Sequence, residues 1–155
     1  MTQFDHIVWA ENSFATRPVA IEAMLGVMLD EGGPHPDLGT TNILGNLGDG
    51  VYLEAIAPNE KTSGGGNLGE QLSKLPDACL YHWALRTSDL ESVANAARAA
   101  GLNPGKITPG SRIQAGGATL QWRLLFLNDP AVGLAAPFLI DWGSTSHPSW
   151  HVGAA

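Results

Sequence analysis

The amino-acid sequence predicts an α+β protein assembled from two tandem βαβββ modules. One observation behind this prediction is a strand-like run with a histidine near the start of each half. The other is an apolar run with one carboxylate near the end of each half. In chain order these side chains are His6, Glu54, His82 and Asp141. An ionisable group inside an apolar strand costs free energy unless it is paired or bound to a metal ion. The same cost in both halves indicates one site shared by two modules.

The elements of the first half follow from its local patterns. Residues 3–9 alternate as a strand, with His6 on one face and Asp5 on the other. Apolar residues at helical spacing predict a helix over 19–28. The glycines and prolines of 32–39 predict a turn-rich loop. Two strands complete the half, at 40–47 and 51–56, joined by a hairpin turn at 48–50.

A polar, glycine-rich linker at about 59–76, with a short helix at 67–75, leads to a second half of the same order. Its predicted elements are a strand at 79–86, a helix from 88 to 101, and strands at 111–115, 118–127 and 138–142. The single domain 1–155 thus divides into module one at about 1–58, module two at about 77–145, and a tail at 146–155 that we expect to be exposed.

Composition narrows the classes of partner. The chain has 155 residues, of which 44% are hydrophobic, and a net charge of −7. Its 8 basic residues are scattered, which argues against a nucleic-acid partner or an anionic membrane surface. Cys79 has no second cysteine to pair with, and no signal peptide or membrane-spanning run is recognisable. These features favour a cytoplasmic protein with a small-molecule substrate.

The repeated side chains suggest a metal site. If the uncovered sheet faces curl around a shared cleft, His6, Glu54, His82 and Asp141 converge there. Two imidazoles and two carboxylates suit a divalent ion such as Zn, Ni, Fe, Mn or Co. The alternative is that these residues are ordinary core histidines and cross-strand carboxylates and that no metal is bound.

Five further residues are candidates for binding a substrate. His35, between two prolines, either rims the cleft or caps a turn, and Asn42 offers a hydrogen bond. Arg86 and Arg123 either anchor a substrate carboxylate or pair with an acid of the protein. Tyr52 shares a strand face with Glu54. Four tryptophans stand beside cleft-facing positions, so alternation predicts that they face the helices, and the alternative is an aromatic wall of the cleft: Trp9, Trp83, Trp122 and Trp142.

Two motifs carry a resemblance to a known family. The run 33–42, GPHPDLGTTN, followed by GDGVYLE at 48–54, resembles the glyoxalase-like branch of the vicinal oxygen chelate superfamily. The resemblance implies eight main strands around a half-open, barrel-like cleft. It also implies metal ligands on the first and last strands of each module, the places held by His6, Glu54, His82 and Asp141. Glyoxalase I usually has Glu as the fourth ligand, and Asp141 is shorter.

Three functions are compatible with this resemblance. The leading hypothesis is a metal-dependent lyase or isomerase that acts on a small oxygenated metabolite through an enediolate-type intermediate, with Glu54 or Asp141 as the general base. The second is a metal-free module of the drug-sequestering, resistance type, which commonly works as a homodimer. The third is an extradiol-type dioxygenase.

Overall fold

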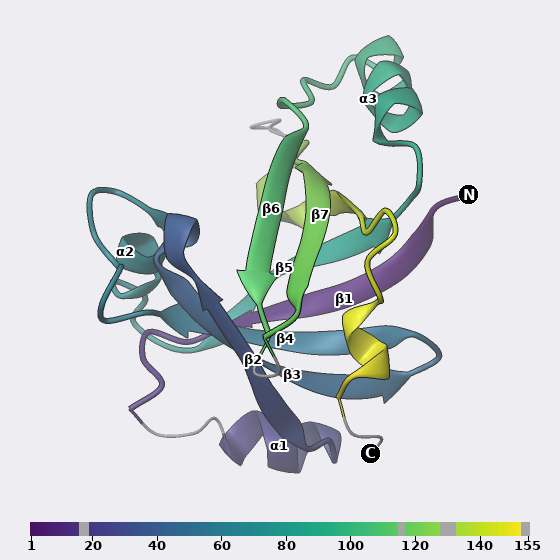
Figure 1. Ribbon diagram of the computed structural model, residues 1–155. Coiled ribbons are helices and arrows are strands. Elements are labelled where there is room, and N and C mark those ends of the chain that lie inside the picture. The colour runs from purple at the N-terminus through teal and green to yellow at the C-terminus, as the bar shows by residue number, and fades with distance from the viewer. Residues whose placement is uncertain (16–18, 115–116, 128–132, 153–155) are drawn as a thin grey trace.

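The computed structural model describes residues 1–15, 19–114, 117–127 and 133–152. Eight strands form one mixed sheet (Figure 1). They are β1 (Gln3–Ala10), β2 (Leu29–His35), β3 (Thr40–Gly48), β4 (Val51–Pro58), β5 (Cys79–Arg86), β6 (Thr108–Ile113), β7 (Thr119–Leu125) and β8 (Phe138–Asp141). The helices are α1 (Val19–Leu25), α2 (Leu68–Leu72) and α3 (Leu90–Ala99), with 3₁₀ turns η1 (Pro36–Leu38), η2 (Gly133–Ala135) and η3 (Pro148–Trp150).

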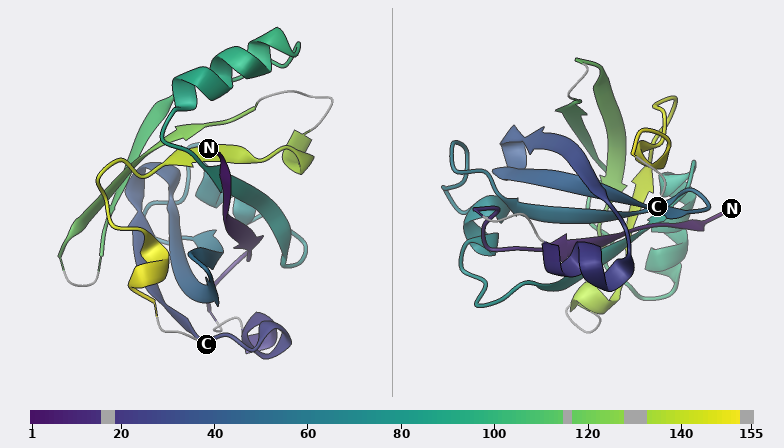
Figure 2. Two further views of the ribbon diagram at one scale, coloured as in Figure 1. Left: turned by 90° about the vertical axis from the view of Figure 1, so that its right-hand side faces the viewer. Right: turned by 90° about the horizontal axis from the view of Figure 1, so that it is seen from below.

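The strand order repeats within the sheet. It runs β2-β3-β4-β1 and then β5-β8-β7-β6, so that each half contributes four neighbouring strands. Strands β1 and β5 pair antiparallel at the centre, and within each half the last strand pairs parallel with the first. The outer strands β2 and β6 approach each other, which nearly closes the sheet into a barrel (Figures 1 and 2). The predicted doubled α+β fold is confirmed.

Each long helix covers the outer face of its own module. Ile21 of α1 packs with Leu29 and Leu53, and Leu90 of α3 packs with Leu139. Burying a leucine side chain contributes about 1.5–3 kcal/mol, so these contacts hold both helices against the sheet. The helices lie at opposite ends of the molecule (Figure 1). None of the helices in the described ranges is long and apolar enough to cross a membrane.

The predicted turn-rich loop at 32–39 is wrong over 32–35, which belong to strand β2, Leu29–His35. Its second half is the 3₁₀ turn η1, which ends at Gly39 in the left-handed conformation. Strand β2 lies at the edge of the sheet, where Pro34 can be accommodated despite its missing N–H group. Its pairing with β3 is irregular between Glu31 and Gly33, and Gly33 has a φ of 141° that favours glycine. The turn signals therefore mark an irregular edge strand up to His35 and a true turn after it.

The C-terminal segment is also placed differently from the prediction. Within 146–152, His147 and Ser149 are buried, not exposed. The amide of Asn46 on β3 donates to the carbonyl oxygen of Ser149 at 3.2 Å. The turn η3 therefore packs against the first module, while 153–155 lie outside the described residues.

Candidate functional site

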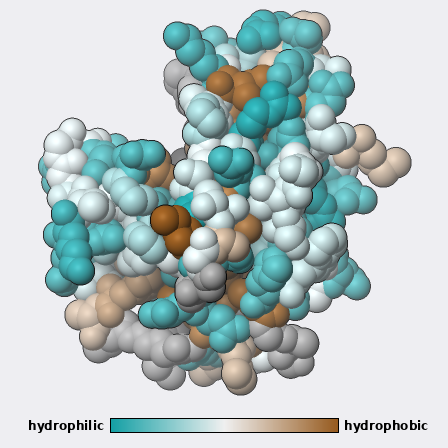
Figure 3. Space-filling view, in the orientation of Figure 1, coloured by the Kyte–Doolittle hydropathy of each residue, from teal (hydrophilic) through white to brown (hydrophobic). Residues whose placement is uncertain are grey.

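The interior of the barrel contains a cavity of about 120 Å³. Its wall is mainly aromatic and aliphatic. On the outer face of the molecule shown in Figure 3, hydrophobic side chains also lie among polar ones. The polar residues of the wall include His6, His35, Asn42, Glu54, His82 and Arg112. An apolar cavity of about 150 Å³ is known to hold benzene, so this space suits a ring or a short branched chain.

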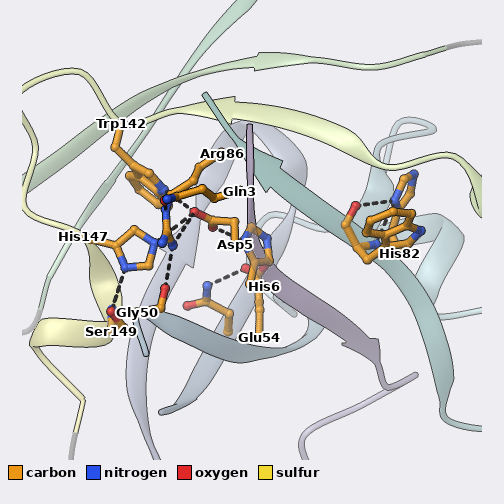
Figure 4. Close-up of polar contacts among 12 residues, drawn as sticks. Gln3, Asp5, His6, Gly50, Glu54, His82, Arg86, Trp142, His147 and Ser149 are labelled. Carbon is orange, nitrogen blue, oxygen red and sulfur yellow. Dashed lines mark hydrogen bonds and ion pairs between the residues drawn. The ribbon is translucent and has the colours of Figure 1, made fainter. Parts of the chain in front are cut away.

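The buried carboxylate of Asp5 holds one of the cavity histidines in place. The Oδ1 atom of Asp5 lies 2.5 Å from Nδ1 of His6, and Oδ2 accepts hydrogen bonds from Trp142 at 3.1 Å and His147 at 2.9 Å (Figure 4). The pairing of β1 with β5 shifts between Phe4 and His6. Regular alternation placed Asp5 on the helix side, and this irregularity is why the prediction failed for it.

These contacts define the proton positions around Asp5. Burial alone would raise the pKa of Asp5, but hydrogen bonds from His147 and His6 outweigh it and hold the pKa below its ordinary value. Asp5 is therefore ionised, and Nδ1 of His6 must carry the proton that joins them. The other ring nitrogen, Nε2, then faces the cavity without a proton when the ring is neutral.

His147 fastens η3 to this group. Its Nδ1 atom lies 2.7 Å from Oγ of Ser149, while its Nε2 atom contacts Asp5. The hydrogen bonds that link Asp5 to His147 and His147 to Ser149 follow the same order as those of a catalytic triad. However, Ser149 is buried and does not line the cavity, so these bonds position the segment.

Glu54 lies next to His6 on the same wall. Its Oε2 atom is 3.6 Å from Nε2 of His6, and its Oε1 atom accepts a hydrogen bond from Asn42 at 2.6 Å. Behind Asn42, Nδ1 of His35 lies 3.1 Å from the hydroxyl of Thr40. Burial lowers the pKa of His35, only partly opposed by Glu54, so the ring stays neutral at pH 7. Three predicted residues therefore gather here with His6.

His82 lines the cavity on another side, apart from this group (Figure 4). Its Nδ1 atom accepts the backbone N–H of Trp83 at 2.9 Å, and burial lowers the pKa of its ring. The ring of Phe138 contacts both histidines, with centroid distances of 5.3 Å to His6 and 5.1 Å to His82. One aromatic ring thus contacts both imidazoles.

The strand register explains what stands in the place of the expected second carboxylate. In each module, the residue two positions after the histidine pairs with a cavity-lining residue of the last strand. In the first module, Val8 follows His6 by two positions and pairs with Glu54. In the second module, Ala84 follows His82 by two positions and pairs with Phe138. Asp141 comes three residues later, so alternation sends it to the opposite face of the sheet.

Asp141 consequently does not join the other predicted ligands. Its Oδ2 atom accepts a hydrogen bond from Arg123 at 2.6 Å, and Arg123 also contacts Glu91 at 2.7 Å. Within the ranges that the structure describes, no group of three or more His, Cys, Asp or Glu residues could hold a metal ion. The residues present do not fit the four-ligand divalent site that the sequence predicts.

The predicted substrate-binding residues fall into two sets. His35, Asn42 and Tyr52 line the cavity, and burial raises the pKa of Tyr52, so its hydroxyl stays protonated. Arg86 instead donates to the carbonyl oxygen of Gly50 at 2.7 Å, and Arg123 lies outside the cavity.

Sequence reasoning missed other residues of the wall. Trp122 and Trp142 line the cavity, as the alternative of an aromatic cleft wall has it and against the preferred helix-side placement. Trp9 packs with the α1 cluster as predicted. Arg112 of β6 also lines the cavity. Its neighbours on the predicted strand 111–115 include Ser111 and Gln114 and form no apolar run, so no local signal marked Arg112 as buried.

Comparisons with known proteins agree with this fold. A family model described as "Glyoxalase-like domain" matches residues 4–154. None of the curated proteins matches the sequence significantly. Among solved structures, methylmalonyl-CoA epimerase from Mycobacterium tuberculosis is similar with a TM-score of 0.63 and 20% identity over 91% of this chain and 88% of that one.

Two hypothetical proteins are also similar. The one from Bacillus halodurans has a TM-score of 0.67 and 18% identity, over 94% of this chain and 97% of its own. The one from Staphylococcus aureus has a TM-score of 0.71 and 19% identity over 97% of this chain, which spans 63% of that protein's length. At these identities the likeness concerns the fold.

Proposed function

The chain belongs to the glyoxalase-like domain family of the vicinal oxygen chelate superfamily, and on this premise we propose that it is an isomerase-type enzyme that works without a metal ion. It binds a small, largely apolar carbonyl compound in the barrel cavity. There it moves a proton at the carbon next to the carbonyl group, with His6 and Glu54 as the proton-carrying groups.

The observation that carries this proposal is the relay formed by Asp5, His6 and Glu54. The carboxylate of Asp5 holds Nδ1–H of His6, so that Nε2 faces the cavity 3.6 Å from Glu54. A carboxylate behind a histidine orients the ring and stabilises its protonated form. A passive apolar pocket has no need of a buried ionised carboxylate such as Asp5, which is costly to place behind a wall of this kind.

The proposed step conserves atoms and electrons. The C–H bond next to the carbonyl breaks, its electron pair stays on the substrate as an enolate, and the proton passes to Nε2 of His6 or to Glu54. The proton then returns to the opposite face of that carbon or to a neighbouring atom. The reaction is an isomerisation, and it requires no co-reactant.

The proposed independence from a metal ion rests on Phe138, which stands where a fourth metal ligand would be expected. Phe138 offers no lone pair where its counterpart in the first module, Glu54, offers a carboxylate. We expect elemental analysis of purified, never-chelated protein to give far less than one divalent ion per chain. A stoichiometric ion in such protein would contradict this part of the proposal.

Deuterium exchange tests the reaction directly. Phenylacetone, phenylacetaldehyde and phenylpyruvate are incubated with the protein in D₂O, and loss of the proton next to the carbonyl is followed by NMR. We expect exchange above the buffer rate with at least one compound, and a fall of about 100-fold or more in His6→Gln and Glu54→Gln. Arg123→Gln, outside the cavity, is the matched control. Exchange that is unchanged in both variants would overturn the assignment.

A second candidate function is binding without chemistry, which the predominantly apolar wall favours. Trp122 and Trp142 line the cavity, so their fluorescence reports occupancy. Under this alternative the compounds bind, but none exchanges deuterium, and His6→Gln leaves their affinity nearly unchanged. The exchange experiment therefore separates the two functions.

A further inference from the structure

We propose that the natural ligand of the cavity is a small carboxylic acid and that Arg112 binds its carboxylate. The proposal deepens the proposed function, because it rests on the cavity being a small-molecule site. It assigns a specificity-determining role to an arginine that neither the sequence motifs nor the proton relay involves.

Arg112 occupies an unusual place in the fold. It lies on β6, at the seam where β6 approaches β2, and one of its N–H groups donates to the carbonyl oxygen of Gly32. Its side chain lines the cavity together with Glu54 and Tyr52, yet only 5% of the residue is exposed. A permanent positive charge is therefore buried in the wall of an apolar pocket.

The charge of Arg112 lacks a close counter-ion. Among the residues that the structure describes, no carboxylate lies within 4.0 Å of its guanidinium group. By contrast, Arg86 reaches Asp5 at 3.8 Å and Arg123 reaches Asp141 at 2.6 Å. Burial lowers the pKa of Arg112, and the more distant charge of Glu54 opposes this only in part. An unpaired buried cation costs free energy that an anionic ligand would offset.

Fastening the seam does not account for the guanidinium group. A guanidinium carries five N–H donors, and within the described part of the chain the carbonyl of Gly32 is the single acceptor that Arg112 reaches. One neutral donor would make the same contact with no charge to bury. The remaining donors match the planar, two-oxygen geometry of a carboxylate.

The charge of the surroundings favours a carboxylate over a phosphate. Glu54 also lines the cavity and bears a carboxylate, so a ligand with two negative charges meets stronger repulsion than one with a single charge. The volume of about 120 Å³ adds a size limit. It leaves room for one ring or a short branched chain beside the anionic group.

Matched ligands and variants test this inference. Benzoate, benzamide and phenyl phosphate share one ring and differ in charge, and their binding is measured by calorimetry. In the wild-type protein we expect benzoate to bind roughly 10- to 100-fold more tightly than benzamide, the range for hydrogen bonds to charged groups. Arg112→Gln should remove this preference, Arg112→Lys should keep part of it, and Arg123→Gln should leave it unchanged.

Each outcome decides between the proposals. Equal binding of benzoate and benzamide, or tighter binding of phenyl phosphate, overturns the carboxylate inference and leaves the small-molecule site intact. Absence of binding by all three compounds overturns the site and this inference together. The comparison in the wild-type protein needs no variant, so it holds even if Arg112→Gln fails to fold because the contact with Gly32 is lost.

Discussion

The two modules share one strand plan but bring different chemistry to the cavity. The first places an ionised carboxylate behind its histidine and a second carboxylate, Glu54, beside it. The second places Phe138 in the position equivalent to Glu54 and stacks it on Phe126 at 5.3 Å. At these matched strand positions, the first module supplies a carboxylate and the second supplies an aromatic ring.

This difference shows that backbone symmetry and chemical symmetry are separable. Pairing of β1 with β4 and of β5 with β8 repeats the same parallel geometry, because backbone hydrogen bonds depend little on which side chain is attached. The cavity-facing positions are free to diverge, since each side chain there contacts the ligand space. A pocket with one polar and one apolar wall can orient a molecule that has a polar end and an apolar body.

The largest expected effect tests the energetic side of this asymmetry. Asp5→Ala removes the acceptor for His6, His147 and Trp142, and we expect a loss of about 3–5 kcal/mol in the free energy of unfolding. His82→Ala in the second module should cost markedly less. Urea denaturation of both variants gives the comparison, and equal losses would mean that the modules do not differ in stability.

The next prediction reverses the asymmetry at one position. Phe138→Glu gives the second module the carboxylate that the first has, and we expect affinity for Zn²⁺ to rise about 100-fold or more. Calorimetry measures this, with Phe138→Gln as a control of similar size that lacks the charge. Affinity unchanged from the wild-type protein would show that Phe138 is not the equivalent of Glu54.

A third prediction concerns the support of Glu54. A Cβ atom on Gly32 would come within 2.0 Å of Oδ1 of Asn42. Gly32→Ala should therefore displace Asn42, weaken its bond to Glu54, and cost about 1–3 kcal/mol of stability. Adding Asn42→Ala should relieve the clash, so the double variant loses less than the sum of the single losses. Additive losses, measured by thermal and urea unfolding, would contradict this packing.

The smallest expected effect is the pH dependence that His35 contributes. Burial lowers the folded-state pKa of His35 below its ordinary value of 6.5. As the pH falls through 6.5, His35 therefore takes up a proton in the unfolded chain before it does so in the folded protein. The free energy of unfolding then decreases by at most about 1.4 kcal/mol per pH unit for this group. His35→Gln should flatten the slope of unfolding free energy between about pH 7.5 and 5.5. The slope from His82, whose pKa is also lowered by burial, should remain.

The sequence predicts the fold better than it predicts the site. Alternation in 3–9 and 51–56 placed His6 and Glu54 on inward faces, and both side chains line the cavity 3.6 Å apart. Asp141 was misassigned because an odd shift in strand register moves a side chain to the opposite face. Asp5 was missed because its strand is irregular at that point.

Two further residues depend on tertiary contacts that no local pattern encodes. Arg112 joins the cavity only because β6 approaches β2 at the seam of the barrel. His147 follows no periodic pattern, and its burial depends on contact with Asp5. Neither the alternation of strands nor the spacing of helices carries information about such long-range closures.

The bond between Asp5 and His147 has a consequence for how the protein is made. These residues are separated by 142 positions in the chain. During synthesis, His147 therefore emerges long after the first module is complete. Until His147 leaves the ribosome, the carboxylate of Asp5 lacks one of its donors. The group around Asp5 is therefore completed by the C-terminal turn η3, and two separately expressed halves would have to associate before either could form the pocket.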